Sequence, residues 1–200
     1  MTSPSERVAA LYQRHARQWA ADRGARLVEK AWLDRFRRLF APAADVLDIG
    51  CGSGEPLAHY LIGQGCAVTG VDSSPAMIAM CRRDFPEGDW RVADMRTLSL
   101  GRVFGGLLAW DSFFHLSHDA QRAMFPLFRA HAAARAALMF TSGPAHGEAI
   151  GHFRGEALYH ASLDAAEYRA LLDAHGFDVA AHVVEDPTCG HRTIWLAKLR

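Results

Sequence analysis

A short apolar segment that runs directly into a glycine-rich turn constrains the fold of this chain more than any other feature. Val46–Ile49 has the composition of a strand buried on both faces, and Gly50, Gly52 and Gly54 follow it at alternate positions. Glycines permit a tight turn and let a ligand approach the main chain closely. A helix is expected from about Glu55, with its first amide groups facing a polar ligand group. This order of elements predicts an α/β fold with a nucleotide-like ligand at the turn.

The spacing of the glycines and a downstream acid narrow the class of ligand. Dinucleotide sites have the pattern G-x-G-x-x-G, but Glu55 stands at the third glycine position and would repel a pyrophosphate. The next predicted strand, Cys66–Asp72, ends in an acid about twenty residues beyond the turn, the separation expected of a carboxylate that accepts ribose hydroxyls. Asp48 would place a second carboxylate beside the same cavity. These features favour an adenosyl ligand without a pyrophosphate over NAD or FAD.

Two segments carry a resemblance to a known family. Val46–Gly54 and Val68–Ile78 resemble the first and second motifs of the class I S-adenosylmethionine-dependent methyltransferases, and the resemblance extends to Leu116. It implies that the glycine turn wraps the methionine part of the cofactor, that Asp72 holds the ribose and that Met77 covers the adenine. The residues that it implies for binding S-adenosyl-L-methionine are Asp48, Gly50, Cys51, Gly52, Gly54, Asp72, Ser73, Met77, Asp94, Met95, Trp110 and Asp111.

Length and composition place limits on the class of protein. Two hundred residues, half of them apolar, predict one domain spanning 1–200. Within it, the family resemblance implies a helical lid over 1–42 and a Rossmann-like core over 43–200. Lys plus Arg and Asp plus Glu each number 22, so the charge balance favours neither nucleic acid nor a membrane surface as a partner. The four cysteines form no C-x-x-C pair and are typical of reduced thiols, so a cytoplasmic protein is expected. No segment has the apolar length of a membrane span.

Two helices are predicted before the first strand. Ser3, Pro4 and Glu6 form a capping signature for the first helix, and apolar residues at helical spacing over 27–39 predict the second. By the family resemblance these helices fold over the cofactor as a lid. The aromatic side chains expected to contact the cofactor are Tyr12, Trp19 and Trp32. The alternative is that these aromatics belong to the hydrophobic core, as aromatics at helical spacing usually do.

The remaining pattern alternates strands and helices, which predicts a doubly wound, seven-stranded sheet with an antiparallel last strand. The segment between Ser142 and His160 shows no periodicity and is expected to be an irregular functional loop. Further strands are expected over 90–93, 103–110, 136–141, 177–184 and 191–199, and further helices over 57–64, 75–85, 118–131 and 164–175.

The reaction edge is expected where the fourth strand ends, at Trp110–Leu116. His115 is the best candidate for a proton acceptor, although a buried structural histidine is an equal alternative. The predicted acceptor pocket lies between this segment, the 142–160 loop and the N-terminal helices, with an apolar wall of Trp110, Phe113, Phe114 and Tyr159. The eleven histidines show no zinc-ligand spacing, so no metal is expected.

The sequence therefore predicts an S-adenosylmethionine-dependent methyltransferase that acts on an oxygen, nitrogen or sulfur nucleophile of a small metabolite. The alternative is a noncatalytic protein that binds S-adenosylmethionine or S-adenosylhomocysteine as a sensor or scaffold, because binding alone does not imply transfer. No nucleic acid or membrane partner is expected. Both a monomer and a homodimer are consistent with the helical pattern.

Overall fold

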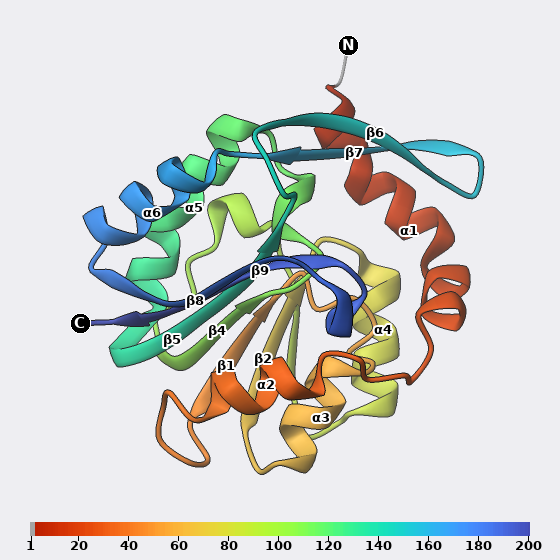
Figure 1. Cartoon of the computed structure of the whole chain (residues 1–200). Helices are drawn as coiled ribbons and strands as arrows, with labels where there is room; N and C mark the ends of the chain where they lie inside the picture. Colours follow the sequence, from red (N-terminus) through yellow and green to blue (C-terminus); the bar gives the residue numbers. More distant parts are fainter. Residues whose placement is uncertain (1–2) are drawn as a thin grey trace.

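The computed structural model describes residues 3–200 and consists of a seven-stranded sheet covered by helices on both faces, with a separate two-stranded hairpin above it (Figure 1). The strands of the main sheet are β1 (Asp45–Ile49), β2 (Ala67–Asp72), β3 (Asp89–Val92), β4 (Phe104–Ala109), β5 (Ala132–Ser142), β8 (Phe177–Asp186) and β9 (Arg192–Leu199), in the order β3-β2-β1-β4-β5-β9-β8. The helices are α1 (Pro4–Arg23), α2 (Lys30–Arg37), α3 (Leu57–Gly63), α4 (Pro75–Asp84), α5 (His118–His131) and α6 (Ala165–Ala174).

The winding of the sheet reverses at β1, as the sequence pattern predicts. β1 pairs in parallel with β2 on one side and with β4 on the other, with Val46 opposite both Val68 and Gly106. β9 runs antiparallel to both of its neighbours, β5 and β8, which confirms the predicted antiparallel last strand. Ligands of open α/β sheets bind at the carboxyl ends of the strands where the winding reverses. This position lies directly above the glycine turn.

Each face of the sheet has its own hydrophobic core. One core packs α5 and α6 against the sheet and contains a group of fully buried aromatic rings, among them Phe113, Phe125 and Phe140. The other packs α2, α3 and α4 against the opposite face and includes Trp32 and Phe36. Because the strands alternate between the two faces, Leu47 belongs to the first core and Val46 to the second.

Only one of the two N-terminal helices lies over the carboxyl edge of the sheet. α1 begins with the predicted capping box, in which the Ser3 amide donates to Glu6 Oε2 at 2.6 Å and Ser3 Oγ accepts from the Glu6 amide at 3.3 Å. The prediction that α2 is also part of a lid is wrong, because its apolar face, with Trp32, Leu33 and Phe36, is buried in the second core.

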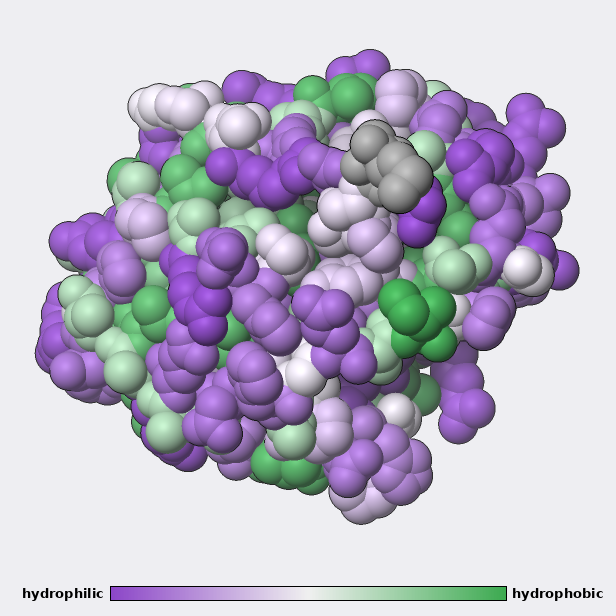
Figure 2. Space-filling model, turned by 90° about the horizontal axis from the view of Figure 1, so that it is seen from above, coloured by the Kyte–Doolittle hydropathy of each residue, from purple (hydrophilic) through white to green (hydrophobic). Residues whose placement is uncertain are grey.

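The segment predicted to be an irregular loop is a regular hairpin. β6 (Gly147–Phe153) and β7 (Glu156–Ser162) pair without interruption, and Arg154 and Gly155 join them with φ angles of 53° and 80°. Two positive φ values in a two-residue connection define a type I′ turn, whose twist suits a hairpin. The prediction failed because an Arg-Gly turn lacks the usual Asn-Gly or Asp-Gly signal and because glycines obscure the alternation of the strands. Figure 2 looks down on this face of the molecule, where polar and apolar residues are interspersed.

Within residues 3–200, none of the helices combines the length and the apolar character that crossing a membrane requires.

Candidate functional site

The glycine turn adopts backbone angles that other residues rarely accept. Gly50 and Gly52 have φ values of 80° and 55°, and both lie against neighbouring side chains. A Cβ at Gly50 would come within 2.3 Å of the Ser112 Cβ, and a Cβ at Gly52 would come within 2.9 Å of the Trp19 ring. The turn therefore needs glycine at both positions, one to admit the segment after β4 and the other to admit α1.

Asp72 is fixed by the backbone at the end of β2. Its two carboxylate oxygens accept hydrogen bonds from the Gly52 amide at 3.0 Å and the Ser74 amide at 2.8 Å. Burial raises the pKa of Asp72, while these two amides lower it. Each carboxylate oxygen retains a further acceptor site, so the group can still receive hydroxyl hydrogen bonds from a ligand in the cavity that it lines.

A first cavity lies above this turn and is closed by α1. From the predicted site it brings together Tyr12, Trp19, Gly50, Gly52, Asp72, Ser73, Met77, Asp94, Met95, Asp111 and His115. Sequence reasoning missed the lining residues from the first turns of α1 (Ser5, Glu6, Val8 and Ala9) and Arg96, Ser117 and Ala120, whereas Ser112 and Leu116 belong to the segment predicted as the reaction edge. The capping signature located the start of α1, but no pattern indicated which of its faces covers the sheet.

Five predicted contact residues do not line this cavity. Trp32 is buried in the second core, where its indole N–H donates to Asp186 Oδ2 at 2.8 Å, so its predicted cofactor contact is wrong. Cys51 and Trp110 are also buried in that core, and a Cβ at Gly54 would face the Phe85 ring and not the cavity. Asp48 is buried beneath the turn. None of these five residues lines the first cavity.

Asp48 carries an unusual charge environment. Burial and, to a lesser extent, the nearby Asp72 charge raise the pKa of Asp48 to about 7. Asp72, which lines the first cavity, and the buried Asp48 are therefore near each other, and this pair favours a ligand with positive charge.

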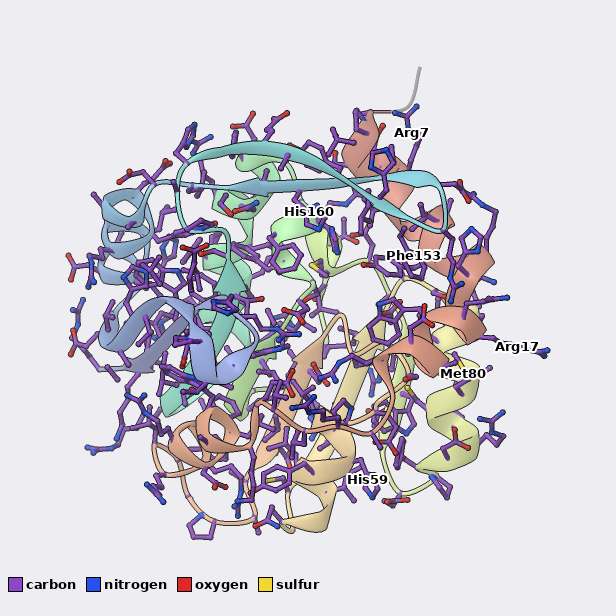
Figure 3. All side chains as sticks on the ribbon, turned by 45° about the vertical axis from the view of Figure 1, so that its right-hand side comes forward. Arg7, Arg17, His59, Met80, Phe153 and His160 are labelled. Carbon is purple, nitrogen blue, oxygen red and sulfur yellow. The ribbon has the colours of Figure 1, made fainter. Side chains whose placement is uncertain are left out.

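A second cavity adjoins the first and is enclosed by α1, the start of the hairpin, β7 and the segment after β4. Four residues line both cavities, namely Tyr12, Trp19, Asp111 and His115. Figure 3 shows His160 and Phe153 beneath the hairpin, between it and the body of the molecule, while Arg17 on α1 extends into solvent. The 110–115 segment, the 142–160 segment and an N-terminal helix thus meet around one space.

The second cavity is more polar than the sequence indicates. Of the predicted apolar wall only Phe114 lines it, because Trp110, Phe113 and Tyr159 are buried in the three hydrophobic clusters. The lining instead includes the polar and ionisable residues Arg23, Ser142, His146, Glu148, His160, Ser162, His191 and Arg192. Among the described residues, no group of three potential ligands is arranged to hold a metal ion.

His115 and Tyr12 form a hydrogen-bonded pair at the junction of the cavities. His115 Nδ1 lies 2.8 Å from the Tyr159 carbonyl oxygen, which can only accept, so Nδ1 carries the proton. His115 Nε2 then accepts from the Tyr12 hydroxyl at 3.0 Å. Burial lowers the pKa of His115 to about 4, and burial raises the pKa of Tyr12 well above its ordinary value. Both groups are therefore neutral near pH 7.

Asp111 is held at the same junction by an ion-pair network that the sequence did not reveal. Arg192 donates to both carboxylate oxygens of Asp111, with Nε and Nη2 at 2.8 and 2.7 Å from Oδ2. The buried Glu29 lies 3.6 Å from Arg192 and accepts from Arg23 at 2.7 Å. Asp111 has a φ of 47°, and its amide donates to Thr141 Oγ1. Arg23, Asp111 and Arg192 line the second cavity, and the buried Glu29 contacts both arginines.

Comparison with known proteins agrees with this geometry. The model of a methyltransferase domain matches residues 46–134. A SAM-bound amino pentose methyltransferase of calicheamicin biosynthesis from Micromonospora echinaspora superposes with a TM-score of 0.72 at 21% identity, covering 95% of this chain and 97% of that one. Residues 46–134 therefore match a methyltransferase domain, and the fold of the chain is that of the superposed methyltransferase.

Other methyltransferases show similar degrees of likeness. The 1,6-didemethyltoxoflavin-N1-methyltransferase of Burkholderia thailandensis superposes with a TM-score of 0.72 at 20% identity, covering 100% of this chain and 91% of that one. The dTDP-3-amino-3,6-dideoxy-alpha-D-glucopyranose N,N-dimethyltransferase of Streptomyces fradiae is 37% identical over 97 residues, or 48% of this chain and 38% of that enzyme. The chain spans between 21% and 38% of the length of the curated relatives that it matches.

The residues of the first cavity suit S-adenosylmethionine, which the superposed amino pentose methyltransferase binds. Asp72 offers acceptor sites at the end of β2, and the thioether side chains of Met77 and Met95 offer apolar surface for a planar base. The carboxylates of Asp48 and Asp72 suit a ligand that carries positive charge. Asp94, whose carboxylate accepts from the Arg96 backbone and side chain, lines the cavity at the end of β3.

Proposed function

We propose that this chain transfers a methyl group from S-adenosylmethionine to an amine nitrogen of a small, polar metabolite. The observation that carries the proposal is the junction itself. The cavity that suits the cofactor meets a second cavity, which several ionisable side chains line, at Tyr12, Trp19, Asp111 and His115. Donor and acceptor held in these two spaces would meet at these residues. Alignment of two reactants in this way contributes a large part of the rate of a transfer reaction.

The cofactor would be held by the turn at Gly50 and Gly52, by Asp72 and by Met77, under the cover of α1. When bound, S-adenosylmethionine supplies a methyl group that its sulfonium already activates for displacement. The chain therefore has to orient the acceptor, exclude water and, for some acceptors, remove a proton.

Tyr12 is suited to orient the acceptor. Its proton is donated to His115 Nε2, so the lone pairs of its oxygen are free to accept a hydrogen bond from an acceptor N–H or O–H. His115 is itself fixed by the Tyr159 carbonyl. We therefore assign His115 a positioning role that holds the Tyr12 hydroxyl, in place of the proton-acceptor role that the sequence indicates.

The charges at the junction favour an amine over other nucleophiles. Near pH 7 neither His115, whose pKa is lowered to about 4 by burial, nor Tyr12, whose pKa is raised by burial, takes a proton readily, and an alcohol needs such help. A neutral amine attacks with its own lone pair and afterwards releases its proton to water. The Asp111 carboxylate, which Arg192 contacts from one side, can also accept a hydrogen bond from an amine N–H at the junction. Two of the similar proteins described above are named as nitrogen methyltransferases.

The test is turnover with a panel of acceptors that includes amino sugars, linear amines, polyols, phenols and carboxylates, with S-adenosylhomocysteine as the measured product. We expect product above the protein-free rate only with amines, and a rate that rises with pH as the free amine becomes available. Turnover confined to phenols or carboxylates would contradict the nitrogen assignment. Calorimetric binding of S-adenosylhomocysteine without turnover across the panel would instead support the noncatalytic binder.

A further inference from the structure

The edges of the two sheets differ in how they are protected against pairing with another chain. A strand edge presents unpaired N–H and C=O groups, and proteins commonly protect it with charge, short length or a bulge. β3 is only four residues long and carries Asp89 and Arg91. β8 is interrupted by register shifts between Val179 and Ala181 and between Val183 and Asp186. Both edges of the main sheet therefore have protection of a known kind.

The hairpin has one edge that the protein itself covers. On the outer edge of β7, the carbonyl of Tyr159 accepts from His115 Nδ1 at 2.8 Å and the carbonyl of Ala161 accepts from Gln121 Nε2 at 2.8 Å. These bonds show which residues of the hairpin direct their main-chain N–H and C=O groups outward. Because the main-chain groups of Tyr159 and Ala161 point away from β6, those of their partners Ile150 and Glu148 point away from β7. The type I′ turn agrees, since its flanking pair, Phe153 and Glu156, is the hydrogen-bonded one.

The outer edge of β6 carries the carboxylate of Glu148 but has neither the short length of β3 nor the register shifts of β8. The residues of β6 whose main-chain groups point away from β7 are Glu148, Ile150 and His152. All three residues are exposed, Ile150 to 51%. β6 pairs with β7 over seven consecutive residues without a register shift, and the strand contains neither proline nor lysine. In Figure 1 β6 lies on the outside of the hairpin, away from the main sheet. The face seen in Figure 2 shows apolar residues scattered among polar ones and not gathered in one broad patch.

These three residues of β6 can pair with the same three residues of a second copy. If two antiparallel copies of β6 pair with Ile150 on the two-fold axis, Ile150 faces Ile150 and Glu148 faces His152 of the second copy. All three are hydrogen-bonded pairs, so the main-chain groups that β7 leaves free are satisfied together. The carboxylate and the imidazole would share one face of the new sheet, where opposite or hydrogen-bonding cross-strand pairs are stabilising.

We propose that this chain forms a homodimer in which the β6 strands of two copies pair antiparallel about Ile150, so that the two hairpins make one four-stranded sheet. The arrangement is isologous and closes on itself, because each copy offers the same edge. The paired β6 strands also lie next to the second cavity, because Glu148 and Ala149 line it. His152 of the second copy would therefore lie at the rim of the acceptor space. This inference does not depend on the proposed acceptor.

The test is sedimentation of the full chain over a dilution series, compared among matched variants. The wild-type chain is expected to be a dimer. Ile150→Pro removes an N–H that points away from β7 and should weaken dimerisation at least about tenfold, with the circular dichroism spectrum unchanged. Val184→Lys changes another exposed apolar residue, 47% exposed on the edge strand β8, and should leave the dimer intact.

Two further variants keep the proposal testable if Ile150→Pro fails to fold. Glu148→Lys should weaken the dimer, and the double variant Glu148→Lys/His152→Glu should restore it. Ile150→Cys should form a disulfide between copies on mild oxidation, because residues that face each other on the axis lie about 5.5 Å apart. A monomeric wild-type chain throughout the series, a dimer that Ile150→Pro leaves unchanged, or a dimer lost in Val184→Lys would each overturn the proposal.

Discussion

The Tyr12 hydroxyl lies 3.0 Å from His115 Nε2, although the two residues are 103 positions apart in the chain. α1 brings the tyrosine to the carboxyl edge of the sheet, and the short helix η2 (Phe113–His115), after β4, brings the histidine there. The Tyr159 carbonyl fixes the histidine tautomer, so the hairpin takes part in the same arrangement. Three elements therefore determine where one hydroxyl group points at the junction of the cavities.

Tyr12→Phe removes that hydroxyl and keeps the ring. We expect kcat with an amine acceptor to fall about tenfold, the effect of about one lost hydrogen bond, while S-adenosylhomocysteine affinity changes little. His115→Gln should lower kcat by a similar factor. The double variant should have the same kcat as either single variant, because each of the three variants removes the same hydrogen bond. Single-turnover rates with saturating cofactor measure this. Fully additive losses would show that the two residues act independently.

Gly52→Ala places a methyl group within 2.9 Å of the Trp19 ring at a φ of 55°. α1 must then shift away from the turn, and we expect S-adenosylhomocysteine affinity to fall by at least about tenfold. Calorimetry measures the affinity. Trp19→Ala opens space for the added methyl group, so the double variant should recover part of the loss relative to Trp19→Ala alone. Strictly additive effects would mean that backbone strain, and not the contact with Trp19, is responsible.

Asp72→Ala removes the acceptor for two backbone amides as well as the expected ribose contact. Charge-assisted hydrogen bonds contribute about 1.5–3 kcal/mol, so cofactor affinity should fall by roughly tenfold to a hundredfold. The melting temperature without cofactor should fall too, because the Gly52 and Ser74 amides lose their partner. Asp72→Asn keeps one acceptor oxygen and should have smaller effects on both quantities. Unchanged affinity in Asp72→Ala would contradict the ribose role.

Asp48 should make the protein less stable as the pH rises. Its pKa is raised by burial from 3.8 to about 7, so between these values the unfolded chain binds fewer protons than the folded one, and the free energy of unfolding decreases with increasing pH. Asp48→Asn removes this dependence. We compare the free energy of unfolding of Asp48→Asn with that of the wild-type chain, both without cofactor. The difference in favour of the variant should be on the order of 1–3 kcal/mol larger at pH 8 than at pH 4. Urea unfolding at both pH values measures the difference, and an equal advantage at both would contradict the assignment.

The sequence was sufficient for the part of the fold that local pattern determines. The apolar run before Gly50 and the acid at Asp72 located the first two strands and the ligand edge, because buried parallel strands and tight turns accept few residue types. α1 was found through its capping box, which is a local signal. The doubly wound, seven-stranded sheet with an antiparallel last strand was also predicted, and the structure confirms it.

The sequence was insufficient where position depends on contacts between distant segments. Trp32 and Trp19 both lie on N-terminal helices at helical spacing, yet one is core and the other lines the cavities. Which of them faces a ligand depends on how each helix packs on the sheet, and a single helical pattern does not contain that information. The Asp111–Arg192 pair was missed for the same reason, since 81 residues separate its members.

α1 is tied to the tip of the hairpin at several exposed points. Glu156 accepts from His15 at 2.6 Å and pairs with Arg14, and Arg154 donates to Asp22 at 2.6 Å. Exposed ion pairs of this kind are weak and are screened by salt. Because α1 covers part of the first cavity, movement of this helix widens the way out for a bound cofactor. The residence time of the spent cofactor should therefore shorten as rising ionic strength screens these surface charges.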